Sequence, residues 1–224
     1  MKQIMLFALA LMMAVPCTSF AQSQKELNKE RNEVVKQSKK ELNARVGKAT
    51  RKEARKLKKE GWLVSPGALP LEKQLEKSYT MQYEYDESGY PLYIMAEAMS
   101  IGENYDAAKM QALELAKQNL AGQIQTEVTA LIENTVANRQ LAADDAASIT
   151  ESVSASKNLI SQSLGRVLPV MEVYRSKGNK NKEVLVRLAY NQKMAYEAAK
   201  RAIRQDLENK GIKLHNQLDQ VLGF

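Results

Sequence analysis

The sequence predicts an α+β fold: a four-stranded antiparallel sheet made of two hairpins, packed with helices on one face and preceded by a long basic N-terminal helix. Two observations lead to this prediction. Two pairs of segments with alternating apolar residues are separated by a long region of helical periodicity, so strands and helices are segregated along the chain. The 224 residues are 44% hydrophobic and 26% charged, which is typical of a packed domain.

The chain begins with the features of a signal peptide, residues 1–21. Lys2 supplies a positive charge, Ile4–Val15 is an unbroken apolar run, and Ser19-Phe20-Ala21 places small residues before a cleavage site. As a helix the apolar run would be about 18 Å long, short of the roughly 30 Å hydrocarbon core, so we expect no transmembrane span in the mature chain. We expect export to the periplasm or cell envelope of a Gram-negative-type bacterium.

Cys17, the single cysteine, leaves open a second route, in which cleavage before it is followed by lipidation. Pro16 beside the scissile bond disfavours this route, so cleavage after Ala21 is the preferred prediction. The mature chain would then have no cysteine and no disulfide. One cysteine and one histidine also provide no ligand set for structural zinc and no Cys–His nucleophile pair.

Residues 22–61 are predicted to form a basic helical arm. Lys25–Glu60 contains fourteen Lys and Arg against six acidic residues, a net charge of +8, whereas residues 61–224 carry a net charge of −2. The arm has no proline and a thin apolar stripe, which favours a solvated helix resting one edge on the body. Its candidate docking residues are Lys39, Lys40, Arg51, Lys52, Arg55, Lys56, Lys58 and Lys59.

Other uses of the arm stay open at this point. The seven-residue spacing of Val35, Leu42 and Ala49 is compatible with a short coiled coil or a surface for a partner helix. The positive charge also suits anionic lipid or another anionic envelope polymer. We expect no nucleic acid partner, because export removes the usual target and the arm has no interleaved aromatic residues for base stacking.

The first predicted hairpin follows a turn-rich connector at residues 62–78. In Tyr79–Tyr85 the tyrosines and a methionine alternate with polar residues, as in a half-buried strand. Residues 86–89 form a turn, and Tyr90–Ile101, rich in Tyr, Ile and Met, is the second strand. This hairpin opens the α+β domain, which we place at residues 79–210.

Two helices are expected between the hairpins. From Ala107 to about Asn138, apolar residues recur at steps of three and four, and Asp106 is the expected N-cap. A second helix is expected from Asp144 to about Leu164.

The second hairpin pairs Arg166–Ser176 with Glu183–Tyr190. Asn191 is expected to cap a last long helix through Lys210, followed by an amphipathic tail at residues 211–224. The expected buried face of the last helix comprises Met194, Ala195, Ala198, Ala202, Ile203 and Leu207.

Residues 90–209 resemble a bacterial envelope family, the LPP-twenty lipoproteins, and the related N-terminal domain of the flagellar assembly protein T. The matching features are a strand ending in Ala96-Glu97-Ala98 and Ile101-Gly102, an alanine-rich helix, a Ser-rich helix, and a closing strand with Val184-Leu185-Val186-Arg187-Leu188. The alanine-rich helix contains Ala107-Ala108, Ala112-Leu113, Ala116 and Asn119-Leu120-Ala121. The resemblance implies an exported, envelope-associated, non-enzymatic domain used in structure or assembly, without catalytic residues.

The remaining polar candidates suggest no catalysis and no metal or cofactor site. His215 is a lone imidazole without a second ligand nearby in the sequence. Asp144-Asp145 stand at a helix start, where acidic residues favour the helix dipole. The acidic residues at the turn, Glu84, Asp86 and Glu87, do not have the spacing of a calcium loop.

The tyrosines of the first predicted hairpin are the candidate binding surface: Tyr79, Tyr83, Tyr85, Tyr90 and Tyr93. Such rings stack on a sugar or peptide, but tyrosine is also a common packing residue in strands. The leading hypothesis is therefore an exported, non-enzymatic envelope protein that acts as a structural or interaction module, with the basic helix as its docking element and an envelope protein or anionic envelope polymer or lipid as its partner. The alternative is a glycan- or peptide-binding domain that uses the tyrosines.

Overall fold

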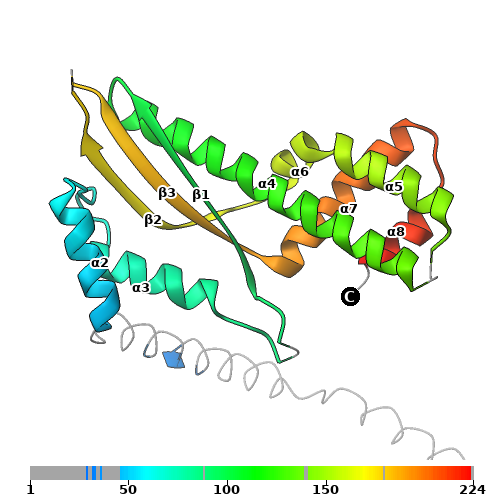
Figure 1. Ribbon diagram of the computed structural model, residues 1–224, viewed down its shortest axis with the longest axis horizontal. Helices are drawn as coiled ribbons and strands as arrows, with labels where there is room; N and C mark the ends of the chain where they lie inside the picture. The colour runs from blue at the N-terminus through cyan, green and yellow to red at the C-terminus, as the bar shows by residue number, and fades with distance from the viewer. Residues whose placement is uncertain are drawn as a thin grey trace, which may run out of the picture. The chain divides into compact units, whose positions relative to one another are not determined.

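The computed structural model describes residues 46–222 except 88, 139, 140 and 179, and in addition Lys29, Asn32, Glu33 and Lys36. The chain divides into two compact units, residues 1–45 and residues 46–224. All the labelled helices and strands in Figure 1 belong to the second unit. The expected signal peptide, Cys17, Lys39 and Lys40 lie outside the described residues. The domain borders expected from the sequence therefore stay a prediction.

Three strands form one antiparallel sheet in the order β1-β3-β2 (Figure 1). They are β1 (Tyr93–Gly102), β2 (Leu168–Ser176) and β3 (Lys182–Asn191). β2 and β3 form the second predicted hairpin, which is confirmed. β1 pairs with the other side of β3, with Ala98 opposite Val186. β3 is therefore the central strand, and β1 and β2 are the two edges.

The four-stranded sheet expected from the sequence is wrong, because most of its first strand is replaced by a helix. Helix α3 (Leu71–Gln82) covers the beginning of the expected strand Tyr79–Tyr85. The buried residues of α3 recur at helical spacing from before the first tyrosine, and this repeat outweighs the two-residue alternation of the tyrosines. These buried residues are Leu71, Gln74, Leu75, Ser78 and Met81. In the described residues, the first hairpin is reduced to an isolated bridge between Tyr85 and Pro91.

Helices cover both faces of the sheet, not the single face expected. Helix α4 (Tyr105–Ala137) packs on one face, where its small side chains let the helix approach the strands closely. Alanines of α4 and alternate residues of β3 form this layer: Ala108, Ala112, Ala116, Val184, Val186 and Leu188. Helices α2 (Lys48–Lys59) and α3 lie over the other face. Their layer with the sheet contains Ala54, Trp62, Leu71, Leu75, Met171 and Val173.

The start of α4 differs slightly from the expectation. Its N-cap is Asn104, whose side-chain oxygen accepts a hydrogen bond from the Ala107 N–H at 2.9 Å. Asp106, the expected cap, lies in the first turn instead, where its charge still favours the helix dipole. The expected helix from Ala107 to about Asn138 is otherwise confirmed.

The expected helix from Asp144 to Leu164 is split in two: α5 (Ala143–Ala155) and α6 (Lys157–Ser163). Ser156 separates them, and its hydroxyl donates to the carbonyl of Ser152 at 2.5 Å. Such a local bond competes with the regular helix ladder, and serines of this kind often bend helices. The break lets both helices pack against α4.

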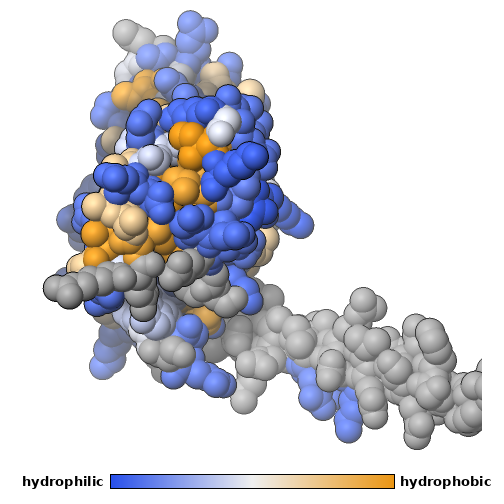
Figure 2. Space-filling model, turned by 90° about the vertical axis from the view of Figure 1, so that its right-hand side faces the viewer, coloured by the Kyte–Doolittle hydropathy of each residue, from blue (hydrophilic) through white to orange (hydrophobic). Residues whose placement is uncertain are grey.

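Helix α4 continues past the sheet and forms a second, helical half with α5, α6, α7 (Gln192–Asn209) and α8 (His215–Leu222). Figure 2 views this half from its end and shows a mostly hydrophilic surface with smaller hydrophobic patches. Asn191 caps α7 as expected, accepting from the Met194 N–H at 3.1 Å. The expected buried face of α7 is confirmed except at Met194, which is 53% exposed.

Candidate functional site

Helix α2 presents a basic surface to the outside of its unit. Its inner edge is fixed by Ala54, which is fully buried against the layer around Trp62. The outer side carries exposed cations at steps of three and four, which places them in one row along the helix. We call this row, Lys52, Arg55, Lys56 and Lys59, the basic surface. None of its four cations forms an ion pair with another described residue.

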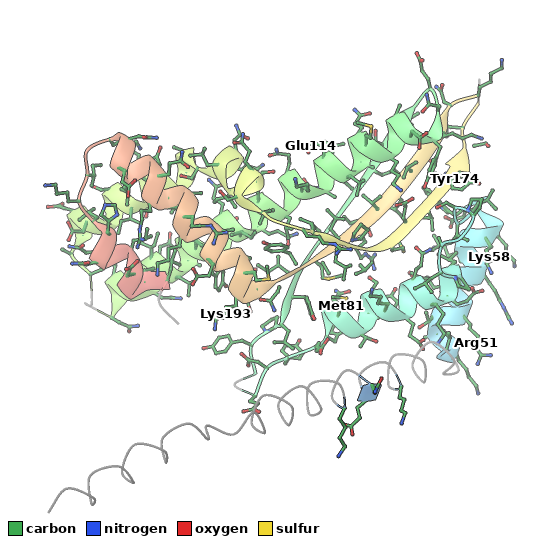
Figure 3. All side chains as sticks on the ribbon, turned by 180° about the vertical axis from the view of Figure 1, so that it is seen from behind. Arg51, Lys58, Met81, Glu114, Tyr174 and Lys193 are labelled. Carbon is green, nitrogen blue, oxygen red and sulfur yellow. The ribbon has the colours of Figure 1, made fainter. Side chains whose placement is uncertain are left out.

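The other two candidate docking residues on α2 are less available. Arg51 is half-buried. The Lys58 ammonium lies 2.6 Å from a carboxylate oxygen of Glu72 on α3. This hydrogen bond holds the pKa of Glu72 below its ordinary value. Figure 3 shows Arg51 and Lys58 on α2. The structure thus separates the candidates into an outer row of four and a pair at the inner flanks.

The five candidate tyrosines do not share one surface. Tyr79, on α3, is half-buried and donates a hydrogen bond to the carboxylate of Glu53 on α2, which raises the Tyr79 pKa together with burial. Tyr93, on β1, is half-buried against the small cluster that contains Met81. These two side chains help to hold helices on the sheet.

The other three tyrosines lie on the segment between α3 and β1, residues 83–92, which we call the tyrosine loop. Tyr83, Tyr85 and Tyr90 are exposed by 64%, 54% and 64%. Two backbone hydrogen bonds close the loop: the Asp86 N–H donates to Tyr90 O at 2.8 Å, and the Leu92 N–H donates to Glu84 O at 2.9 Å. The loop therefore holds its exposed rings on a defined backbone.

A pocket of about 530 Å³ lies beside the tyrosine loop. The loop, α4 and the beginning of α7 contribute to its lining: Asp86, Tyr90, Pro91, Leu92, Leu131, Asn191, Gln192, Lys193 and Tyr196. The Gln192 N–H donates to Leu92 O at 2.9 Å, which ties the loop to α7. Figure 3 shows Lys193 at the start of α7.

Tyr196 gives the pocket a neutral, mainly apolar wall. Its hydroxyl donates to a carboxylate oxygen of Glu127 at 2.8 Å and accepts from the Gln192 side chain at 3.0 Å. Burial, together with the bond to Glu127, raises the Tyr196 pKa to about 12. The sequence does not predict that Tyr196, Leu131 and Gln192 line a pocket. A tyrosine within a helical pattern is interpreted as a core residue, and only the tertiary fold brings α4 and α7 to the loop.

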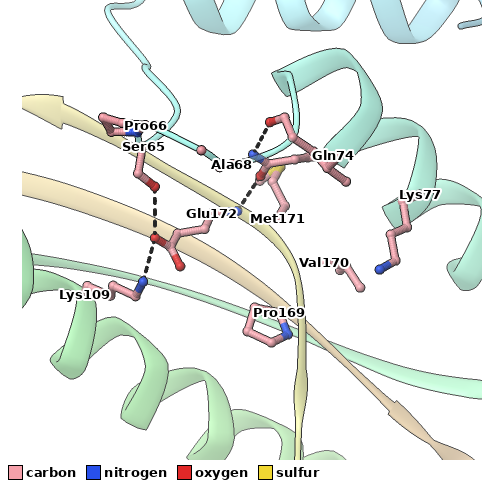
Figure 4. A pocket seen from close by; sticks show the side chains of 12 residues that line it. Ser65, Pro66, Ala68, Gln74, Lys77, Lys109, Pro169, Val170, Met171 and Glu172 are labelled. Atoms are coloured by element: carbon pink, nitrogen blue, oxygen red, sulfur yellow. Dashed lines mark hydrogen bonds and ion pairs between the residues drawn. The ribbon is translucent and has the colours of Figure 1, made fainter. Parts of the chain in front are cut away.

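A second hollow, of about 390 Å³, lies at the edge of β2 (Figure 4). Its polar centre is Glu172, which is 2.9 Å from the Lys109 ammonium and accepts a hydrogen bond from Tyr105. Burial and this bond raise the Tyr105 pKa, while the bond to Glu172 raises that of Lys109. The raised pKa values keep Tyr105 neutral and Lys109 positively charged, as expected of a structural ion pair.

His215 has one acidic neighbour among the described residues. His215 lies 3.9 Å from Glu208, which is at the limit of an ion pair. Among the residues that the structure describes, no three His, Cys, Asp or Glu side chains come together in a way that would hold a metal ion. No helix in the described ranges is both long and apolar enough to cross a lipid bilayer.

No family model, no curated protein and no solved structure matches this chain. The resemblance to the LPP-twenty lipoproteins and to flagellar assembly protein T therefore stays a prediction.

Proposed function

We propose that this chain is an exported, non-enzymatic interaction module of the bacterial cell envelope, and that helix α2 docks it onto an anionic partner. The observation that carries the proposal is the placement of the basic surface. Ala54 and its neighbours hold the inner edge of α2, so Lys52, Arg55, Lys56 and Lys59 face outward on a fixed helix.

Charge distribution supports docking through this helix. Residues 61–224 have a net charge of −2, so this part of the chain offers no comparable attraction for an anionic partner. A row of cations on a fixed helix acts mainly by attracting and orienting its partner, and its effect falls with ionic strength. Export, envelope location and the absence of catalysis come from the sequence and form part of the proposal.

The test is retention of the exported protein on washed envelope fragments. We compare the wild-type protein with a charge-reversed variant, in which Lys52, Arg55, Lys56 and Lys59 are each changed to Glu. We expect the wild-type protein to sediment with the fragments at low salt and to be released at high salt, and we expect the variant to stay in the supernatant. Equal retention of both proteins would contradict the proposal.

A second candidate function, binding of a glycan or peptide through the tyrosines, is favoured by the pocket beside three exposed rings. Tyr83→Ala and Tyr90→Ala should then abolish binding in a glycan or peptide array without lowering the melting temperature, because both rings are exposed. Tyr93→Ala is the matched structural variant: Tyr93 packs in the cluster with Met81, so its loss should lower the melting temperature.

A further inference from the structure

We infer that the tyrosine loop of one copy of this chain binds the basic surface on helix α2 of a second copy, so that copies associate head to tail. The inference rests on the proposed function, because it names a second copy as a partner of the same basic surface. It joins two features that are separate within one copy: a fixed row of cations, and a loop of exposed rings and carboxylates.

The tyrosine loop has the composition of a receptor for cationic side chains. Besides its three exposed tyrosines it carries Glu84, Asp86 and Glu87, all exposed, and residues 83–92 include no Lys or Arg. An ammonium or guanidinium group over a tyrosine face gains a cation–π interaction, and a nearby carboxylate adds Coulomb attraction. The same pairing already occurs within this fold, where the Lys109 ammonium lies 5.6 Å from the ring centre of Tyr105 and 2.9 Å from a carboxylate oxygen of Glu172.

Hydrogen bonds within one copy hold the described residues of the loop in place. The Tyr90 N–H donates to the Asp86 carboxylate at 2.9 Å, in addition to the backbone bonds that close the loop. The bond from Gln192 to Leu92 fixes the loop to α7. Binding to a surface that is already ordered avoids much of the entropy cost of forming an interface. The pocket beside Tyr90 gives the aliphatic stem of a Lys or Arg an apolar wall to lie against.

The basic surface matches this receptor in chemistry and extent. Lys52 and Lys59 are seven residues apart, so at 1.5 Å per residue the row is about 10 Å long. None of its cations lies within ion-pair distance of an acidic side chain among the described residues, and Arg55 acts on Glu72 only through its charge, which helps to lower the Glu72 pKa. Since exposed tyrosine is a common anchor of protein interfaces, a cationic helix row is a chemically suitable occupant of the loop.

The occupant is a second copy because α2 cannot turn its outer row toward the loop of its own copy. The Lys58–Glu72 ion pair and the Tyr79–Glu53 hydrogen bond hold α2 on α3. Ala54 is fully buried, and the basic surface lies on the opposite side of the helix. Each copy therefore offers one donor surface and one receptor loop, neither of which contacts the other in the described part of the chain.

Such a contact is heterologous, since different surfaces of the two copies meet. Repetition of a heterologous contact produces a ring where the rotation closes and an open filament where it does not. The contact is built from exposed charges, so we expect association to weaken about tenfold when salt is raised well above the physiological level. Among the described residues that line the pocket, Lys193 is the one cation, so Lys193→Glu should strengthen association.

The experiment is sedimentation equilibrium of the exported protein, purified from the periplasm of an expression host, with its N-terminus determined by mass spectrometry. The helix variant reverses the basic surface to Glu, and the loop variant combines Glu84→Lys, Asp86→Lys and Glu87→Lys. We expect the wild-type protein to show a mass that rises with concentration at low salt, and each variant alone to be monomeric. An equimolar mixture of the two variants should associate again, because an acidic helix now meets a basic loop.

The control variant carries the same change of net charge as the loop variant but on exposed acidic residues elsewhere: Glu103→Lys, Glu114→Lys and Glu133→Lys. It should associate like the wild-type protein. A wild-type protein that stays monomeric at low salt, a mixture that does not associate, or binding of a neutral oligosaccharide to the loop of a monomeric protein would each overturn the inference. If the inference is overturned but the helix variant loses retention on envelope fragments, the proposed function is still supported. If the wild-type protein associates with itself but is not retained on the fragments, only the proposed function is refuted.

Discussion

The side-chain oxygen of Gln74 on α3 accepts a hydrogen bond from the backbone N–H of Glu172 on β2, at 2.7 Å. The amide nitrogen of the same side chain donates to the carbonyl of Leu69, also at 2.7 Å. Gln74 is 5% exposed, so both bonds lie in the interior. Beyond it on the same edge, Leu63 and Tyr174 exchange two backbone hydrogen bonds. An amide side chain and a short bridge thus protect an edge strand that would otherwise be open to pairing.

Gln74→Met should lower the free energy of unfolding by about 1–3 kcal/mol. Methionine has a similar volume but leaves the Glu172 N–H and the Leu69 carbonyl without their partners inside the protein. The measurement is urea denaturation followed by circular dichroism. Gln82→Met, at the exposed end of α3, is the matched control and should change stability by less than about 0.5 kcal/mol. Equal stability of Gln74→Met and the wild type would show that the two bonds contribute nothing.

Gly102→Ala should destabilise the connection between β1 and α4. A Cβ atom at Gly102 would lie 2.6 Å from the Ala108 backbone nitrogen, so the first turn of α4 would have to move. We expect a loss of about 1–3 kcal/mol, as for other insertions into packed regions. Gly178→Ala is the control, because its Cβ would meet no atom within 4 Å. The measurement is the melting temperature of each variant. A Gly102→Ala variant as stable as the wild type would show that the first turn of α4 shifts without an energetic cost.

Much of this fold could be predicted from the sequence where one periodicity dominates. β2, β3, α4 and α7 have clean repeats and were placed within a few residues. The segment at α3 was not, because the buried residues Gln74 and Ser78 are polar and hide the apolar face of the helix. Their burial depends on distant partners: Ser78 accepts a hydrogen bond from Arg187 at 2.8 Å. A tertiary contact of this kind leaves no signal in local sequence.

The candidate site was predicted only in part for the same reason. Basic residues on α2 and tyrosines on the loop stand out by their type. Which of them are exposed depends on contacts between elements, such as that between Tyr79 and Glu53. Tyr196 and Leu131 enter the pocket through packing of α4 and α7, which no spacing in the sequence indicates.

Lys109→Met should destabilise the protein by about 1–3 kcal/mol, because it removes the cation beside a mostly buried carboxylate at Glu172. Lys77→Met is the matched control: Lys77 lines the same hollow but pairs with no described acidic residue, so we expect a change within about 0.5 kcal/mol. Both are measured by urea denaturation at neutral pH. If the two variants were equally stable, the Lys109–Glu172 pair would be an exposed contact without energetic weight.

Tyr196 should make the stability of the helical half fall in alkaline solution. Its pKa rises from 10.0 to about 12 in the folded state, because burial and the Glu127 carboxylate disfavour the phenolate. Above pH 10 the unfolded chain releases this proton while the folded chain retains it. The stabilisation from the hydroxyl is therefore complete below pH 10 and is lost as the pH rises toward about 12.

The measurement is the difference in unfolding free energy between the wild type and Tyr196→Phe, followed from pH 8 to the alkaline range. At pH 8 the Tyr196 hydroxyl keeps its hydrogen bonds, so the wild type should be more stable than Tyr196→Phe by about 0.5–1.5 kcal/mol. Phenylalanine has no proton to release, so this difference should disappear as the pH rises above 10. Tyr83→Phe is the control for loss of a hydroxyl: Tyr83 is 64% exposed, so at pH 8 this variant should differ from the wild type by less than about 0.5 kcal/mol. A Tyr196→Phe difference that does not change with pH would mean that the hydroxyl of Tyr196 is solvated in the folded protein rather than held by Glu127.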